Sequence, residues 1–91
     1  MSTILNACKV TKGLIKRSKE LQKNIPGIII NDKWYAHKPS VQLAKEAASE
    51  AVIACKLVIP QLDKNSKRLN YYVNALHKNQ DFLAEARRQE Y

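Results

Sequence analysis

The segment 41-VQLAKEAASEAVIACKLVI-59 decides the fold. Wound at about 100° per residue, it gathers its apolar residues on one unusually wide side of a helix. That side holds Leu43, Ala44, Ala47, Ala51, Val52, Ala54, Cys55, Val58 and Ile59. Such a helix must be covered by more than one neighbour, and its alanines let those neighbours approach closely. Ser40 is its expected N-cap, and Pro60 ends it because proline lacks an N–H and clashes with the preceding turn.

Upstream, residues 3–25 form the first expected neighbour. Small or apolar residues recur there at alternating steps of three and four, which is typical of an amphipathic helix. They are Ile4, Ala7, Thr11, Leu14, Ser18, Leu21 and Ile25. Pro26 disfavours helical backbone at the residue before it, so the helix should end there.

Residues 26–39 join these two helices and contain an isoleucine triplet and two aromatic residues. The pattern favours an extended crossover whose apolar side chains pack against the helices. A minimal β-hairpin turning at Asn31-Asp32 is the alternative, because isolated two-stranded ribbons are marginal. We expect Ile28, Ile29, Ile30, Trp34 and Tyr35 to be core or interface anchors, with stacking on exposed nucleic-acid bases as the weaker alternative for the aromatic pair.

Downstream, the spacing of Leu69, Tyr72, Val73 and Leu76 predicts a helix over 64–79. A further helix over 81–90 follows if the NQD sequence at 79–81 breaks the chain; otherwise the two are one bent helix. The sequence therefore predicts an all-α fold in a single domain, 1–91: a small bundle of three or four helices (3–25, 40–59, 64–79 and 81–90) with the crossover or hairpin at 26–39.

The net charge is +8, and most of it lies in the N-terminal part of the chain. Residues 1–40 hold eight Lys or Arg against two acids, a balance of +6, whereas residues 41–91 hold eight against six, a balance of +2. A field of this sign favours nucleic acid, anionic lipid or an acidic protein surface, without choosing among them.

Five lysines of the first helix are in register. Lys9, Lys12, Lys16, Lys19 and Lys23 repeat in steps of 3, 4, 3 and 4. On a helix these steps confine them to an arc of about 80° along about 21 Å. We call this row the lysine stripe. Like charges at these spacings repel by a few tenths of a kcal/mol each, so the stripe is either a solvated face or a surface that binds something anionic.

Nothing in the sequence indicates catalysis, a cofactor or a metal site. His37 and His77 have no partner at a dyad or metal-ligand spacing, and the Glu46 and Glu50 pair lacks companion ligands. Cys8 and Cys55 lie on apolar helix faces, where packing is the expected role and a disulfide between them the alternative.

We therefore expect an intracellular, non-enzymatic protein without a transmembrane segment, cytoplasmic by default. The acid-free, basic N-terminus leaves an organelle such as the mitochondrion as the other compartment. The leading function is an interaction or assembly subunit of a larger complex. It would dock through apolar helix faces onto a protein partner or a second copy, with its basic first helix facing an anionic partner. The alternative is a sequence-nonspecific nucleic-acid-binding protein that uses the lysine stripe.

Overall fold

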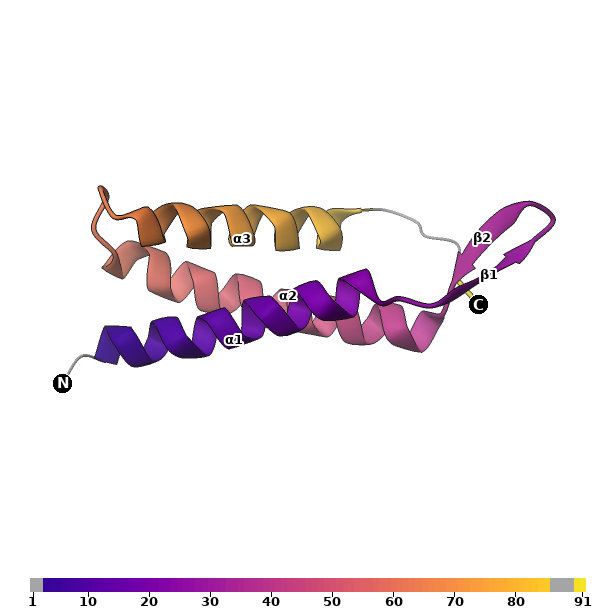
Figure 1. Cartoon of the computed structure of the whole chain (residues 1–91), viewed down its shortest axis with the longest axis horizontal. Coiled ribbons are helices and arrows are strands. Elements are labelled where there is room, and N and C mark those ends of the chain that lie inside the picture. The colour runs from indigo at the N-terminus through magenta and orange to yellow at the C-terminus, as the bar shows by residue number, and fades with distance from the viewer. Residues whose placement is uncertain (1–2, 86–89) are drawn as a thin grey trace.

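A computed structural model describes residues 3–85 and 90–91 of the chain. Its elements in order are α1 (Thr3–Lys23), β1 (Gly27–Ile30), β2 (Lys33–Ala36), α2 (Lys38–Val58), the short 3-10 helix η1 (Ile59–Gln61) and α3 (Lys67–Ala84). Both α1 and α3 run antiparallel to α2 and lie along it (Figure 1). This arrangement confirms the predicted small helical bundle, and residues 26–39 form the β-hairpin alternative.

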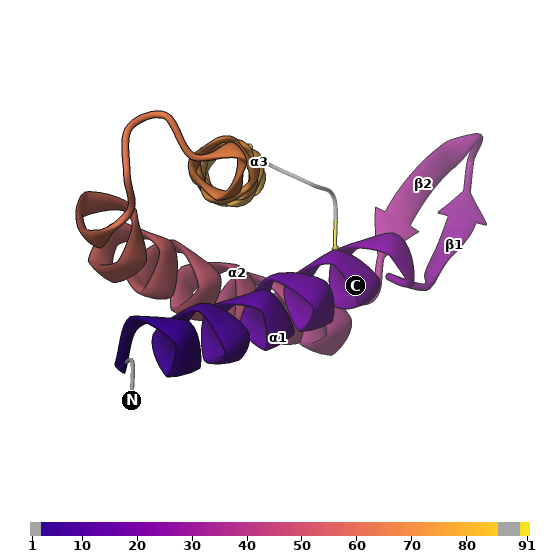
Figure 2. The ribbon, with the colours of Figure 1, turned by 60° about the vertical axis from the view of Figure 1, so that its left-hand side comes forward.

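The alanine-rich face of α2 is the centre of the bundle. Val41, Val52 and Val58 are buried on it, together with the alanines at 44, 47, 48 and 51. Because an alanine adds so little bulk, both α1 and α3 pack against α2 (Figure 2). Side chains of α1 and α3 also hydrogen-bond each other. The expected wide apolar side is thus covered on two sides, although Leu43 lies outside it and is 48% exposed.

A buried polar cluster fixes how α1 meets α3. The Ser18 hydroxyl donates to Asn79 Oδ1, and Gln22 Nε2 donates to both Ser18 Oγ at 2.9 Å and Asn79 Oδ1 at 3.1 Å. Asn79 Nδ2 in turn donates to the Ala75 carbonyl at 2.7 Å. A buried amide left unpaired would cost about 1–3 kcal/mol, so a shift of one helix along the other is disfavoured.

The start of α2 differs from the prediction. The helix begins at Lys38, His37 is its N-cap, and Pro39 lies in the first turn, where a missing N–H costs nothing. Ser40 is therefore not the cap. Its hydroxyl instead bonds His37 Nδ1 at 2.8 Å.

The hairpin projects beyond the ends of the helices (Figure 1). Its strands pair antiparallel, Gly27 opposite Ala36 through Ile30 opposite Lys33, and Asn31 and Asp32 turn with φ of 52° and 65°. Asn and Asp tolerate this left-handed region, which the right-handed twist of a two-residue hairpin requires. The prediction that the isoleucine triplet and Trp34 pack against the helices is wrong, because all four side chains are exposed.

The end of the chain returns to the base of the hairpin. Tyr91 N–H donates to the Ala36 carbonyl at 2.9 Å, and Lys38 N–H donates to the Tyr91 carbonyl at 3.1 Å. Ala36 is fully buried there. The hairpin is therefore anchored at its base, while its tip stands free.

Of the two alternatives for the C-terminal segment, one helix or two, the structure shows one continuous helix up to Ala84. α3 runs from Lys67 through residues 79–81 to Ala84, because Asn79 is held in the polar cluster and does not cap a helix end. Ser66 caps its start by accepting from the Arg68 N–H at 3.1 Å. Residues 86–89 of the predicted last helix lie outside the described residues.

The molecule is elongated, 55 × 21 × 16 Å, with a radius of gyration of 15.4 Å. A compact chain of this length would have a radius of gyration of about 12 Å. Within the described part of the chain, every helix is too short or too polar to cross a bilayer.

The central aromatic residue is Tyr72, which is fully buried and donates its hydroxyl to the Cys8 carbonyl at 3.3 Å. Burial, followed by this contact with Cys8, raises the pKa of the Tyr72 hydroxyl from 10.0 to about 12. The two cysteines are buried and free, as expected for packing residues, and they form no disulfide.

The raised pKa of Tyr72 predicts a loss of stability at high pH. Between about pH 10 and pH 12 the unfolded chain releases the tyrosine proton while the folded chain keeps it, so the free energy of unfolding falls as pH rises. Tyr72→Phe removes this contribution and about 1 kcal/mol of hydrogen bonding. Urea unfolding of both proteins, followed by circular dichroism from about pH 9 to 11.5, should show the stability advantage of wild type falling with pH and then reversing, because the pKa rise to about 12 outweighs about 1 kcal/mol of hydrogen bonding. If the two proteins differ in unfolding free energy by the same amount at every pH, the raised pKa of Tyr72 is contradicted.

Candidate functional site

All five members of the lysine stripe are exposed on α1. Among the described residues the structure holds one ion pair, Arg17 Nη1 to Glu50 Oε2 at 3.7 Å, and it lies on the flank of α1 that faces α2. Both of its side chains are half exposed, so the pair contributes little to stability. The lysine stripe is thus left without carboxylate neighbours within ion-pair distance in the described structure.

Cations from α3 join one end of the stripe. A hollow of about 430 Å³ opens between the two helices. It is lined by Lys12 of α1 and by Lys67, Arg68, Tyr71 and Tyr72 of α3. Three positive side chains therefore border this space, and no acidic side chain of the described residues lines it.

A second hollow, of about 290 Å³, continues along the same pair of helices. Its lining residues are Ile15, Lys19, Gln22, Tyr71, Asn74, Ala75, Lys78 and Asn79. Tyr71 lines both hollows and so stands between them. We call the two hollows together the α1–α3 groove.

The polarity changes beyond the groove. A broader hollow of about 700 Å³ is lined by Gln22, Lys78, Asp81, Phe82, Ala84 and Glu85. The Asp81 carboxylate makes the lining of this hollow less positive than that of the groove.

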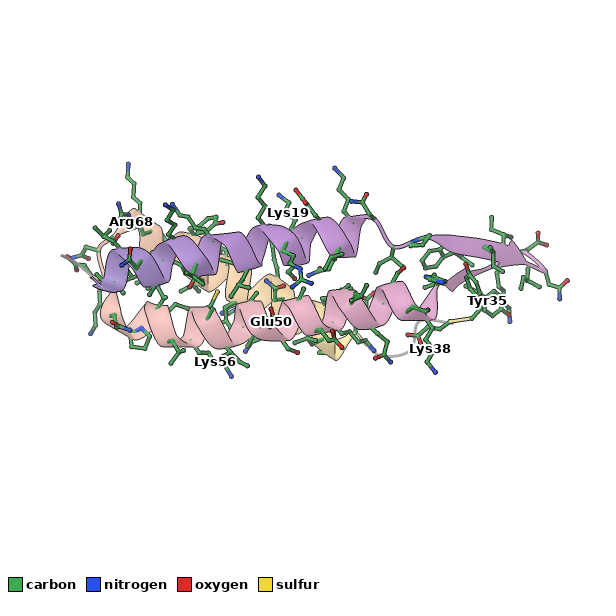
Figure 3. All side chains as sticks on the ribbon, turned by 90° about the horizontal axis from the view of Figure 1, so that it is seen from below. Lys19, Tyr35, Lys38, Glu50, Lys56 and Arg68 are labelled. Atoms are coloured by element: carbon green, nitrogen blue, oxygen red, sulfur yellow. The ribbon has the colours of Figure 1, made fainter. Side chains whose placement is uncertain are left out.

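Figure 3 shows from below where several of the charged side chains lie. Lys19 and Arg68 lie along the edge of α1 that faces away from α2, whereas Lys38 and Lys56 lie along the opposite edge. Glu50 lies at the seam between α1 and α2. The flank with the lysine stripe therefore combines cations from two helices.

Sequence reasoning did not identify the contribution of α3. Lys67, Tyr71, Asn74 and Lys78 follow one another in steps of 4, 3 and 4, which places them on one helix face. That spacing was a usable signal. Only the packing of α3 beside α1, however, brings this face to the lysine stripe.

The hairpin is a second candidate surface. Ile29 is 74% exposed, Trp34 48%, and Ile28 and Ile30 between 40 and 50%. Alternation along the strands places Ile29 and Trp34 on one face of the ribbon and Ile28 and Ile30 on the other. Fully burying these four partly exposed side chains on a partner would yield on the order of 3–6 kcal/mol of apolar transfer energy.

The Trp34 ring lies over Gly27. A Cβ at position 27 would come within 2.3 Å of the indole, so only glycine accommodates this packing. One part of the ring is therefore used inside the hairpin, while about half of the residue remains in solvent.

The described residues contain no group of three or more His, Cys, Asp or Glu side chains that could hold a metal ion. His37 Nδ1 is bonded to Ser40, and the His37 ring lies 5.6 Å from that of Tyr91. Burial raises the pKa of the Cys55 thiol, which disfavours the reactive thiolate.

No protein-family model matches this sequence, and comparisons with curated proteins and with solved structures find no significant similarity.

Proposed function

We propose that the protein is a non-catalytic, sequence-nonspecific nucleic-acid-binding protein that holds a phosphate backbone along the lysine stripe and the α1–α3 groove. The observation that carries this proposal is that Lys12 and Lys19 of α1 meet Lys67, Arg68 and Lys78 of α3 in two hollows. Among residues 3–85 and 90–91, no acidic side chain lines either hollow. Binding would release the counterions that these phosphates hold, which is the main source of nonspecific affinity.

The geometry favours a charged polymer over a membrane surface. Cys8 and Ile15 of α1 are buried in the bundle core, so the apolar side of this helix is not free to enter a bilayer. The positive row also extends over about 21 Å of helix, which suits a ligand with repeated charges.

Docking onto a protein partner is the second candidate function, and the hairpin favours it. The hairpin is anchored at its base and has two apolar faces. These faces suit insertion into an apolar groove of another protein. Leu43, Ile53 and Leu57 on the outer side of α2 are also exposed and would extend such a contact. We rank this function second because the wide alanine face of α2 is covered by α1 and α3 within the chain and is not free for a partner.

Charge reversal on the lysine stripe tests the first function. Five phosphate contacts predict a slope of about −4 in a plot of log affinity against log salt. Lys12→Glu combined with Lys16→Glu should lower affinity for a labelled oligonucleotide by at least about 100-fold and flatten the slope, with helicity unchanged. Fluorescence anisotropy from about 50 to 200 mM salt measures both quantities.

The matched control is Lys45→Glu combined with Lys56→Glu on α2. Both lysines are exposed, and the pair changes the net charge by the same amount on a different helix. It should retain most of the affinity. Equal losses in the two double variants would show that only total charge matters, and would overturn the groove as the site.

Substitution in the hairpin tests the second function. Ile29→Ser combined with Trp34→Ser should leave the helical circular dichroism intact but abolish recovery of a stoichiometric partner from nuclease-treated extract of the native source. If the double variant recovers the same partner in the same amount as wild type, docking through the hairpin is contradicted.

A further inference from the structure

We infer that the α1–α3 groove binds single-stranded nucleic acid in preference to duplex, with one base stacked on Tyr71. This inference rests on the proposed function, because it assumes that phosphates occupy the cationic rim. It adds a strand preference and a contact residue that the lysine stripe alone does not provide.

The position of Tyr71 supports stacking. It lines both hollows of the groove and is 45% exposed, so part of its ring borders solvent between the two spaces. Lys12, Lys67 and Arg68 line the hollow on one side of it, and Lys19 and Lys78 line the hollow on the other. A strand crossing the ring would therefore meet cations for the phosphates on both sides of the stacked base.

The Tyr71 ring is also held in place. It meets the Tyr72 ring edge to face, with centroids 5.1 Å apart and planes at 83°. Tyr72 is itself fully buried and hydrogen-bonded to the Cys8 carbonyl of α1. A ring fixed in this way loses little freedom when a base stacks on it.

A duplex cannot use this ring, because its bases are already stacked inside the helix. Phosphate contacts would still form with either ligand. The Tyr71 contribution is therefore specific to unpaired bases, and it tolerates any base because every base has a π face. Trp34 and Tyr91 are also exposed aromatics, but neither lines the groove. Part of the Trp34 ring packs over Gly27 in the hairpin, and the Tyr91 backbone is bonded to Ala36 and Lys38 at the hairpin base.

The test compares a fluorescein-labelled oligothymidylate with a duplex of equal length, by anisotropy at low salt. Wild type should bind the single strand more tightly. Tyr71→Ala should lower single-strand affinity by about 5- to 150-fold, with duplex affinity and the salt slope nearly unchanged. Tyr71→Phe keeps the ring and should bind as wild type.

Two controls keep the result interpretable. Tyr71→Leu fills more of the space beside Tyr72 than alanine does, so a loss shared by Ala and Leu at normal helicity reports the missing ring. Tyr35→Ala removes a tyrosine from the hairpin and should have no effect.

Full single-strand affinity in both Tyr71→Ala and Tyr71→Leu would overturn the stacking inference alone, leaving backbone binding in place. Absence of binding to either ligand by wild type at low salt would overturn the proposed function and the inference together.

Discussion

The close packing permitted by the alanines of α2 is the constraint on which the rest of the structure depends. With Ala44, Ala48 and Ala51 fully buried, two helices fit closely against α2 and come within side-chain hydrogen-bonding reach of each other. Larger residues at these positions would overfill the core, typically at about 1–3 kcal/mol each, and force α1 and α3 apart. The groove between α1 and α3 is therefore a consequence of small side chains on a third helix.

Polar contacts then set the register of the two groove-forming helices. The Ser18–Gln22–Asn79 cluster and the Tyr72 hydroxyl tie α1 to α3 at two levels. This register brings Lys12 beside Arg68 and Lys19 beside Lys78 as members of the same hollows. Cations placed together at this density repel, and a bound polyanion would remove that repulsion. Stability and the proposed function are linked through the same pairing of helices.

Much of the fold follows from sequence periodicity. The steps of three and four in residues 3–25 and the apolar side of 41–59 predicted α1 and α2 to within a few residues. The hairpin was harder to predict. Large apolar residues are usually buried, so the three isoleucines and Trp34 were expected to pack against the helices. Here Asn31 and Asp32 adopt the left-handed turn, and strand pairing carries those side chains out to solvent.

Of the candidate site, only the part on α1 could be predicted from the sequence. The lysine stripe is a property of one helix and can be counted from the sequence. The contribution of Lys67, Tyr71 and Lys78 depends on which face of α3 meets α1, and that is decided by Asn79 and Tyr72 finding their partners 57 to 64 residues away in the chain. Such long-range pairing leaves no local pattern in the sequence.

The central claim is that α1 and α3 bind one ligand together. The most direct measurement is a titration of the ¹⁵N-labelled protein with an oligothymidylate, followed by backbone amide chemical shifts. The account predicts that the largest shifts fall on both sides of the groove, near Lys12 to Lys19 and near Lys67 to Lys78, while the hairpin at Ile28 to Trp34 stays unperturbed. Shifts confined to the hairpin, or spread evenly over α1, α2 and α3, would contradict it.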